Sequence, residues 1–301
     1  MFNESISKPG FNDAIIAFLP FFHIYGIYML FTGLKMGQNL IIMPRFKLSS
    51  FLQLIQTFKA RYLYIVPPIL KYLLEDPSVE NYDITSVEYL MVGGAHLGTE
   101  ITNHALAKFP HILSIQQGYG MTETSCASHI VPIHPIQRRK GGSCGVIMPN
   151  FECKVNNTAI QLILTAIFYV IDTATGEELH EFQTGEICVR GETCCLGYYQ
   201  DAEATDQLFD SKKWLHTGDI GYFDDEKFFY IVERKKDLIK VNCFQVSPTE
   251  LEDLLVKHEQ ILDAAVVGIP DQDTEETPYA FVVPSDDSLS ADDVILFLNG
   301  M

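Results

Sequence analysis

Short apolar runs that end at proline or glycine alternate with helical patterns over the first 140 residues of the chain. The runs and the residues that close them are Asn39–Met43 before Pro44, Tyr62–Val66 before Pro67, Tyr89–Val92 before Gly93, and Ile112–Ile115 before Gly118. Apolar residues at helical spacing separate the first two runs: Phe51, Leu54, Ile55 and Phe58. Such runs are typical of buried strands, and strands separated by helices pair in parallel. The sequence therefore predicts an α/β fold with parallel sheets flanked by helices.

The pattern changes to β from about Ile147 onward. Glu186–Gly191 alternates between polar and apolar residues, and Asp219–Val232 predicts a hairpin that turns at residues 224–226. We expect a small β-barrel-like part here. After Lys236 the pattern becomes that of a small α+β unit.

A helix start is well marked in this last unit. Ser247–Glu250 supplies Ser as N-cap, Pro at the first helical position and Glu at the third. An apolar stripe follows it: Leu251, Leu254 and Leu255. Ala264–Val267 then predicts a strand that ends at Gly268 and Pro270.

Composition limits the possible partners. The chain has 301 residues, 47% of them hydrophobic, which suits one large or two modest domains. Its net charge of -18 argues against nucleic acid, because an acidic surface repels phosphate backbones. A nucleotide site would have to rely on backbone N–H groups and a few basic side chains.

The location of the protein is constrained by its cysteines and its ends. The seven cysteines are odd in number and lack zinc-finger spacing, so we expect reduced thiols and a cytoplasmic protein. Met1–Ser5 does not resemble a signal peptide, and the C-terminus carries no targeting tripeptide, although a longer form could be peroxisomal. The apolar run Ala159–Ile171 is shorter than the roughly 20 residues of a membrane span, so we expect no transmembrane segment.

Three motifs follow one another in a characteristic order: Gln117–Glu123, Trp214–Asp219 and Glu233–Lys240. Two more precede them: Leu19–Gly26 and Gly93–Leu97. Together they resemble the adenylate-forming superfamily, which includes acyl-CoA synthetases, coumarate-CoA ligases and beetle luciferases. The resemblance covers nearly the whole chain.

The resemblance implies that the first motif handles nucleotide. It assigns a cofactor-binding role to Gln117, Gly118, Tyr119, Gly120 and Met121. Glycines let the backbone approach a ligand closely, and the tyrosine offers a flat face to adenine. The alternative is an ordinary strand–turn–helix segment with the residue after Met121 as N-cap.

The two residues that follow would carry chemistry. Thr122 would offer its hydroxyl to the α-phosphate, and Glu123 would bind Mg²⁺ as a hard oxygen ligand.

His23 would line the acyl pocket beside the carboxylate, although a histidine among aromatic residues is more often part of a core. Gly94 and Ala95 would make room for the base and the acyl group, although a simple glycine turn would explain them too.

Four later residues are assigned to nucleotide by the same resemblance. Asp219 would accept hydrogen bonds from the ribose hydroxyls, and Arg234 would meet the ribose or phosphate. The alternative for Asp219 is a turn residue. Lys240 and Gln245 would contact nucleotide in the second half-reaction, and Lys236 would be the hinge between two arrangements of the small domain.

The implied activity is that of an acid–thiol ligase. It would use ATP, Mg²⁺ and CoA to activate a fatty or aryl carboxylate as acyl-AMP and transfer the acyl group to CoA. Two alternatives stay open: a luciferase-like oxygenase that follows adenylation with O₂, and a non-catalytic truncated paralogue or mis-spliced product. Protein partners are not indicated by any motif.

Departures from the family pattern leave enzymatic activity open. We find no counterpart of the family's phosphate-binding loop before Leu19–Gly26, and its C-terminal catalytic lysine falls beyond Met301. Cys243 stands where relatives have glycine. We expect residues 1–235 to form a partial large adenylation domain, β-rich over about 147–235, and 236–301 a truncated small domain. Residues 156–170 fit neither neighbour and suggest an insertion.

Overall fold

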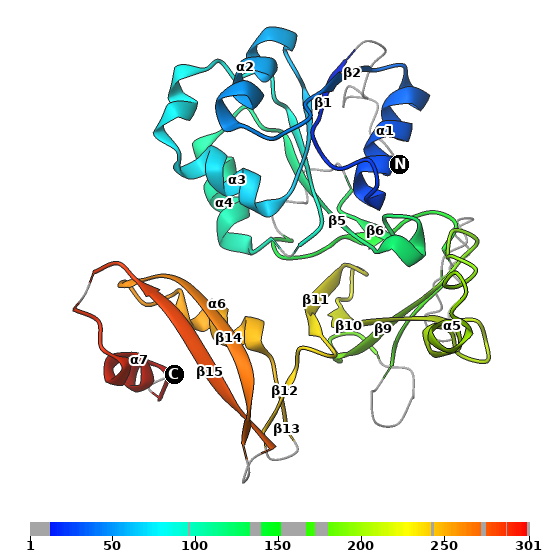
Figure 1. The fold of residues 1–301 in the computed structure, drawn as a ribbon, viewed down its shortest axis with the longest axis vertical. Coiled ribbons are helices and arrows are strands. Elements are labelled where there is room, and N and C mark those ends of the chain that lie inside the picture. The colour runs from blue at the N-terminus through cyan, green and yellow to red at the C-terminus, as the bar shows by residue number, and fades with distance from the viewer. Residues whose placement is uncertain are drawn as a thin grey trace. The chain divides into compact units, whose positions relative to one another are not determined.

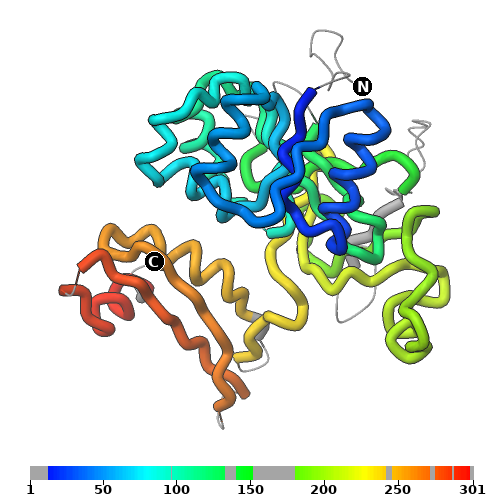
Figure 2. The backbone as a smooth tube through the Cα atoms, turned by 45° about the horizontal axis from the view of Figure 1, so that its top comes forward, coloured from blue at the N-terminus to red at the C-terminus, as the bar shows by residue number. Residues whose placement is uncertain are grey.

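The computed structural model describes residues 13–95, 97–132, 140–151, 167–171, 180–241, 244–271, 275–286 and 288–299. The chain divides into two compact units (Figures 1 and 2). The first contains residues 1–169, 188–215 and 223–230, and the second contains residues 170–187, 216–222 and 231–301. Among the described residues, the helices are too short or too polar to cross a membrane.

The N-terminal part of the first unit has the predicted α/β architecture (Figure 1). Two strands pair in parallel: β1 (Ala14–Ala17) and β2 (Asn39–Ile42). Three more pair in parallel in a second sheet: β3 (Tyr62–Ile65), β4 (Tyr89–Val92) and β5 (Ser114–Tyr119). The helices between them are α1 (Ile24–Met36), α2 (Leu48–Phe58), α3 (Pro67–Glu75), the 3₁₀ helix η1 (Pro77–Asn81) and α4 (Thr99–Lys108).

Strands β1 and β3 are buried throughout and β4 nearly so, which explains their continuous apolar sequence. In β3, Leu63 and Ile65 pack with α2, α3 and α4 in one hydrophobic cluster. Tyr62 and Tyr64 point to the opposite face and pack against α1 in another cluster. Side chains alternate along a strand, so each face of the sheet needs its own helical cover.

Two of the predicted strands differ from expectation. The run beginning at Asn39 was predicted to be a buried strand, but β2 is an edge strand whose Ile42 is 63% exposed. It is an edge because the parallel pairing of β1 and β2 involves no third described strand. The other strand, β5, was predicted to end before Gly118 but continues through Tyr119. It continues because Gly118 and Tyr119 pair antiparallel with β6 (His129–Ile130), which in turn pairs with β7 (Val146–Ile147).

The predicted β-rich part is a four-stranded sheet in the order β11-β10-β9-β8. Its strands are β8 (Ile167–Ile171), β9 (Gly185–Arg190), β10 (Leu215–Phe223) and β11 (Phe229–Arg234), and α5 (Ala202–Leu208) lies between β9 and β10 in sequence. The expected hairpin is confirmed as β10 and β11. The β-rich character expected for this part is therefore confirmed by the described strands. Of the suspected insertion, residues 156–166 lie outside the described part, and 167–170 belong to β8.

The C-terminal α+β pattern is also confirmed. Its sheet has the order β13-β12-β15-β14. The elements are β12 (Ile239–Val241), β13 (Phe244–Val246), α6 (Pro248–Leu255), β14 (Ile261–Asp271), β15 (Glu275–Pro284) and α7 (Ala291–Asn299). Ser247 caps α6 as predicted, since its side chain accepts a hydrogen bond from the Glu250 amide.

The predicted end of the strand at Gly268 and Pro270 is wrong. β14 runs on to Asp271, and both residues pair with β15. Proline lacks an N–H group, but β14 is the edge strand of its sheet, where that loss is tolerated.

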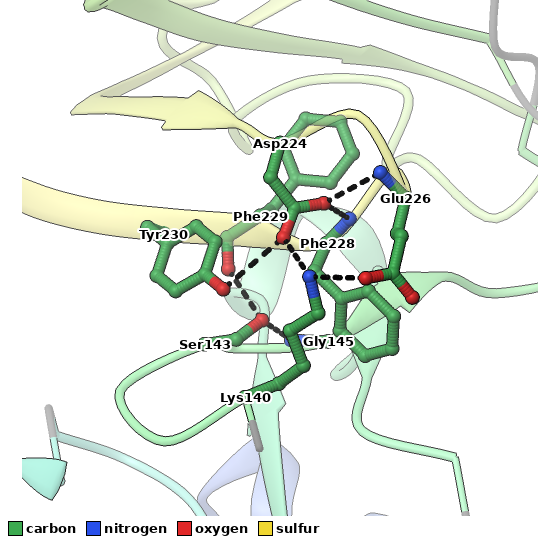
Figure 3. Close-up of polar contacts among 8 residues, drawn as sticks. All are labelled: Lys140, Ser143, Gly145, Asp224, Glu226, Phe228, Phe229 and Tyr230. Atoms are coloured by element: carbon green, nitrogen blue, oxygen red, sulfur yellow. Dashed lines mark hydrogen bonds and ion pairs between the residues drawn. The ribbon is translucent and has the colours of Figure 1, made fainter. Parts of the chain in front are cut away.

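A buried ion-pair network fixes the β10–β11 hairpin (Figure 3). One carboxylate oxygen of Asp224 accepts hydrogen bonds from the amides of Glu226 and Phe228, at 3.0 and 2.9 Å. The other oxygen accepts from Lys140 Nζ at 2.6 Å and from the Tyr230 hydroxyl at 3.2 Å. Lys140 Nζ also contacts Glu226, at 2.7 Å. The network ties the loop after residue 139 to a hairpin more than 80 positions away.

Candidate functional site

A cleft that opens to solvent lies within the first unit, and the space in it, open solvent included, is about 490 Å³. It is formed where β4 and β5 end, beside the start of α1. Its lining residues are His23, Ile24, Tyr25, Tyr28, Met91, Gly93, Gly94, Gly118, Tyr119, Gly120, Cys126, Ala127 and Ile130. The carboxyl ends of parallel strands are the usual place for ligands in open α/β sheets. Three predicted motifs therefore meet at one cavity: Leu19–Gly26, Gly93–Leu97 and Gln117–Glu123.

Glycines shape the cavity wall. Gly94 adopts φ +87°, a conformation that favours glycine. A Cβ on Gly120 would lie 1.8 Å from the carbonyl oxygen of Cys126, so no side chain fits there. A Cβ on Gly93 or Gly118 would meet only ordinary contacts, the nearest at 3.5 and 3.8 Å. The fold would therefore accommodate a Cβ at either position.

His23 lines the cavity and caps α1. Its Nδ1 accepts a hydrogen bond from the Tyr25 amide at 3.1 Å. The neutral ring therefore carries its proton on Nε2, which can donate to a ligand oxygen. The alternative of a buried core histidine is wrong, because the His23 side chain is exposed.

The other wall of the cavity is largely apolar. The Tyr25 hydroxyl donates to the carbonyl of Met91 at 2.8 Å, so its polar end is already satisfied. Burial raises the pKa of the Cys126 thiol to about 11, which keeps it neutral. Sequence reasoning missed Tyr28, Met91 and Cys126 as lining residues. Each lies within three residues of a motif, and that closeness in sequence is the signal that could have identified them.

Tyr119 lies at the end of β5 with its ring 5.2 Å from that of His129. His129 is fully buried, and burial lowers its pKa to about 3, so it is neutral behind the tyrosine. Gln117 was predicted to bind nucleotide, but its side chain is buried and donates to the carbonyl of Leu97 at 3.0 Å. Among the described residues it supports the strand and does not line the cavity.

The segment after the strand is a single 3₁₀ turn, η2 (Thr122–Thr124). Its N-cap is Met121, whose amide donates to the Thr124 hydroxyl at 3.0 Å. The alternative that made Thr122 the N-cap is therefore wrong. Thr122 is exposed, so its hydroxyl can meet a ligand, while Met121 is half-buried.

Glu123 is tied to a loop that follows β9. Its Oε1 accepts a hydrogen bond from the Tyr198 hydroxyl at 2.7 Å, and its carbonyl accepts from the Cys195 amide at 2.7 Å. The bond to the Glu123 carboxylate raises the pKa of Tyr198 to about 12. The described residues contain no cluster of three His, Cys, Asp or Glu side chains that could hold a metal. Mg²⁺ at Glu123 would take its other ligands from phosphate and water, as that ion commonly does.

In the second unit the structure brings Asp219 and Arg234 together. Arg234 Nε lies 3.3 Å from Asp219 Oδ1. The carboxylate side chain is 8% exposed and the arginine side chain 59% exposed. The two residues predicted for the ribose region are therefore adjacent, and their role stays a prediction.

Lys240 and Gln245 are direct partners across the β12–β13 hairpin. Lys240 is exposed, and its amide donates to Glu276 Oε2 at 2.7 Å. Lys236 is exposed and lies between β11 and β12 in the sequence. Ala95 is exposed next to Gly94 but is not among the described residues that line the cavity. The positions of His96 and Cys243, and the side chain of Gln245, lie outside the described residues.

Comparison with known proteins identifies relatives of this chain. The chain is 40% identical over 292 residues to 4-coumarate–CoA ligase 4 of Arabidopsis thaliana, which covers 96% of this chain and 48% of that protein. It is 41% identical over 290 residues to 4-coumarate–CoA ligase 2 of Nicotiana tabacum, covering 94% and 50%. The chain spans about half the length of these curated relatives.

Solved structures show the same fold. ATP-bound MatB from Rhodopseudomonas palustris superposes with a TM-score of 0.83 at 26% identity, covering 96% of this chain and 54% of that one. O-succinylbenzoate CoA synthetase (MenE) from Bacillus subtilis, in complex with the acyl-adenylate intermediate OSB-AMP, gives 0.79 at 25% identity, covering 98% and 55%. Residues 2–199 match the family model described as AMP-binding enzyme, and residues 250–299 match the AMP-binding enzyme C-terminal domain. The chain therefore belongs to the family of AMP-binding enzymes.

Proposed function

We propose that this chain carries the acid- and nucleotide-binding part of an ATP-dependent acid–CoA ligase. The observation that carries the proposal is the cavity in which an exposed His23, a glycine-lined strand end and an apolar wall meet. Such a cavity suits a ligand with a flat polar part, a charged junction and an apolar tail. An acyl-adenylate has these three parts.

The cavity residues have distinct tasks in this proposal. Gly93, Gly94 and Gly118 admit the ligand close to the backbone. The ring of Tyr119 lies against adenine, and His23 donates from Nε2 to an oxygen of the acyl carboxylate or the α-phosphate. Positioning and charge stabilisation of this kind supply most of the catalysis in phosphoryl-type transfer.

The turn after β5 would hold the charged centre. The exposed hydroxyl of Thr122 would donate to the α-phosphate, and the Glu123 carboxylate, which accepts a hydrogen bond from Tyr198, would hold Mg²⁺. Magnesium would neutralise phosphate charge while the substrate carboxylate attacks phosphorus and pyrophosphate leaves. Met121 and Gln117 hold this turn and its strand from inside the unit.

In the second unit Asp219 would accept from the ribose hydroxyls, with Arg234 beside it. Lys240 and Gln245 would serve the transfer of the acyl group to CoA, after rotation at Lys236. The proposed boundary between a large and a small domain, at residues 235 and 236, falls in the stretch 200–249 between the two matched family segments.

The apolar wall favours an aryl or fatty acid as the carboxylate. Tyr25, Tyr28 and Met91 offer flat or flexible apolar surface next to His23. The relatives named 4-coumarate–CoA ligases support an aryl acid as the first to test. The odd number of cysteines and their lack of zinc-finger spacing support a reducing compartment such as the cytoplasm.

Binding is the first test, because it does not require every catalytic group. Calorimetric titration of the purified chain with AMP, and with a non-hydrolysable aryl-adenylate, should give saturable binding. Gly93→Ala adds a Cβ that the fold accommodates at 3.5 Å, so it should weaken the aryl-adenylate without unfolding the protein. Gly98→Ala is the matched control, because its Cβ would have no neighbour within 4 Å.

Equal loss of affinity in both variants, or no binding to the parent chain, would refute the assignment of this cavity. Catalysis is then tested by carboxylate-dependent exchange between ATP and pyrophosphate, with aryl and fatty acids compared. Exchange dependent on one class of acid would identify the substrate class.

A further inference from the structure

A buried carboxylate in β9 organises the strand that carries Asp219. The side chain of Glu186 is 5% exposed and has three neighbouring donors. Lys235 Nζ lies at 3.0 Å, the Gly218 amide at 3.2 Å and His216 Nδ1 at 3.4 Å. Glu186 thereby connects β9 to the middle of β10 and to the residue that follows β11.

Both the amide and the carbonyl group of Gly218 form hydrogen bonds in this arrangement. Its amide donates to Glu186 Oε1, and its carbonyl accepts from the Lys235 amide at 2.8 Å. Gly218 has φ +70° within β10, a left-handed conformation in the middle of a strand. The next amide, that of Asp219, donates to the Thr217 hydroxyl at 3.1 Å. Glu186 and Lys235 therefore both hold the kink at the residue that precedes Asp219.

The charge of Glu186 matters as much as its shape. Burial alone would raise its pKa, but hydrogen bonds from His216 and Lys235 and their charges outweigh burial and lower the pKa to about 2. The carboxylate is thus ionised at every physiological pH. A neutral amide could accept from Gly218, but its NH₂ group would face the two donors and repel the Lys235 ammonium.

We propose that Glu186 is a positioning residue for the ribose-binding pair Asp219 and Arg234. It does not touch the ligand and acts by holding Gly218 in the kinked conformation that directs the Asp219 carboxylate toward Arg234 Nε. The inference rests on the proposed function, because it takes the ribose hydroxyls of a nucleotide as the ligand of Asp219.

The test compares two probes, AMP and 2′,3′-dideoxy-AMP, on the full chain by calorimetric titration. The second probe lacks the hydroxyl groups that Asp219 would bind. The parent chain should bind AMP more tightly. Glu186→Gln should weaken AMP binding about tenfold, the effect expected when hydrogen bonds to an ionised group are misplaced. It should change the affinity for the dideoxy probe less than about twofold.

A general loss of structure would weaken both probes equally, so the ratio of affinities separates positioning from folding. Asp224→Asn is the matched control: it alters a buried, lysine-paired carboxylate at the opposite end of the same hairpin. It should lower the melting temperature and leave the ratio unchanged. If Glu186→Gln does not fold, Lys235→Met, which removes one donor from an exposed position, should shift the ratio in the same direction.

The outcomes distinguish this inference from the proposal beneath it. Absence of AMP binding by the parent chain would refute the proposed function. Equal binding of the two probes by the parent chain would remove the ribose role of Asp219, and Glu186 would then have nothing to position. Preference for AMP in the parent chain that Glu186→Gln leaves intact would overturn the role of Glu186 alone.

Discussion

Asp224→Ala should be among the most destabilising single substitutions in the first unit. The Asp224 carboxylate accepts four hydrogen bonds, from two turn amides, Lys140 and the Tyr230 hydroxyl (Figure 3). Its side chain is 6% exposed and that of Lys140 is 15% exposed. The substitution removes every one of these bonds and leaves the lysine with Glu226 as its remaining partner in the network.

The expected cost follows from this burial. Removing one partner of a buried ion pair costs about 3–5 kcal/mol. Because Lys140 keeps a partly exposed partner in Glu226, we expect the lower end, about 3 kcal/mol. That is a large share of the total stability of about 5–15 kcal/mol typical of a domain.

The single tryptophan provides the assay. Trp214 is buried in the same unit as Asp224, so its fluorescence reports unfolding of that unit in urea. With a denaturant slope of about 1–3 kcal/mol per molar, the transition should move by at least about 1 M. Asp225→Ala is the matched control. Asp225 is next to Asp224 in the sequence and its side chain is exposed, so this substitution should change stability by less than about 0.5 kcal/mol.

The same carboxylate has a definite pH dependence. Burial would raise the pKa of Asp224, but the hydrogen bond from Lys140 and the turn amide outweigh it and lower the pKa. A depressed folded-state pKa stabilises the protein above the ordinary aspartate value of about 4, and the contribution is lost as pH falls through the lowered pKa. The difference between the parent chain and Asp224→Ala should therefore shrink below about pH 4. A stability change equal to that of Asp225→Ala at neutral pH would refute the reasoning.

Two further substitutions test the local geometry. Gly120→Ala should disrupt the cavity, because its Cβ would lie 1.8 Å from the Cys126 carbonyl oxygen. Thermal unfolding should show a clear loss of stability. The control Gly118→Ala, whose nearest contact is at 3.8 Å, should not show this loss. Equal melting temperatures for these two variants would contradict the close approach. Ser247→Ala should cost about 1 kcal/mol in chemical denaturation, because it removes the cap that accepts from the Glu250 amide; an unchanged transition would show that the cap is unimportant.

The order of the parallel strands and their helices was predictable because it is a local property. The whole signal for β3 and for the start of α3 lies in the apolar run Tyr62–Val66 and the proline after it. Ser247 and Glu250 likewise sit within one turn of each other, so the start of α6 follows from four residues. The motif Gln117–Glu123 was recognisable for the same reason, since it is contiguous.

Strand ends were predicted less well, since pairing decides them. Gly118 suggested a turn, yet β5 extends past it because β6 offers a partner. Pro270 suggested a stop, yet β14 continues because the proline lies on an edge. In both cases a neighbour distant in sequence overrides a local breaker.

By itself the sequence determined the α/β class, the family resemblance and the residues His23, Tyr119, Glu123 and Asp219 as candidates. Only the tertiary structure decided what those residues touch. Tyr198 reaches Glu123 across 75 positions, and Lys235 reaches Glu186 across 49. Helix and strand signals lie in neighbouring residues, whereas the partner of a charged side chain is selected by the fold, which brings distant side chains together.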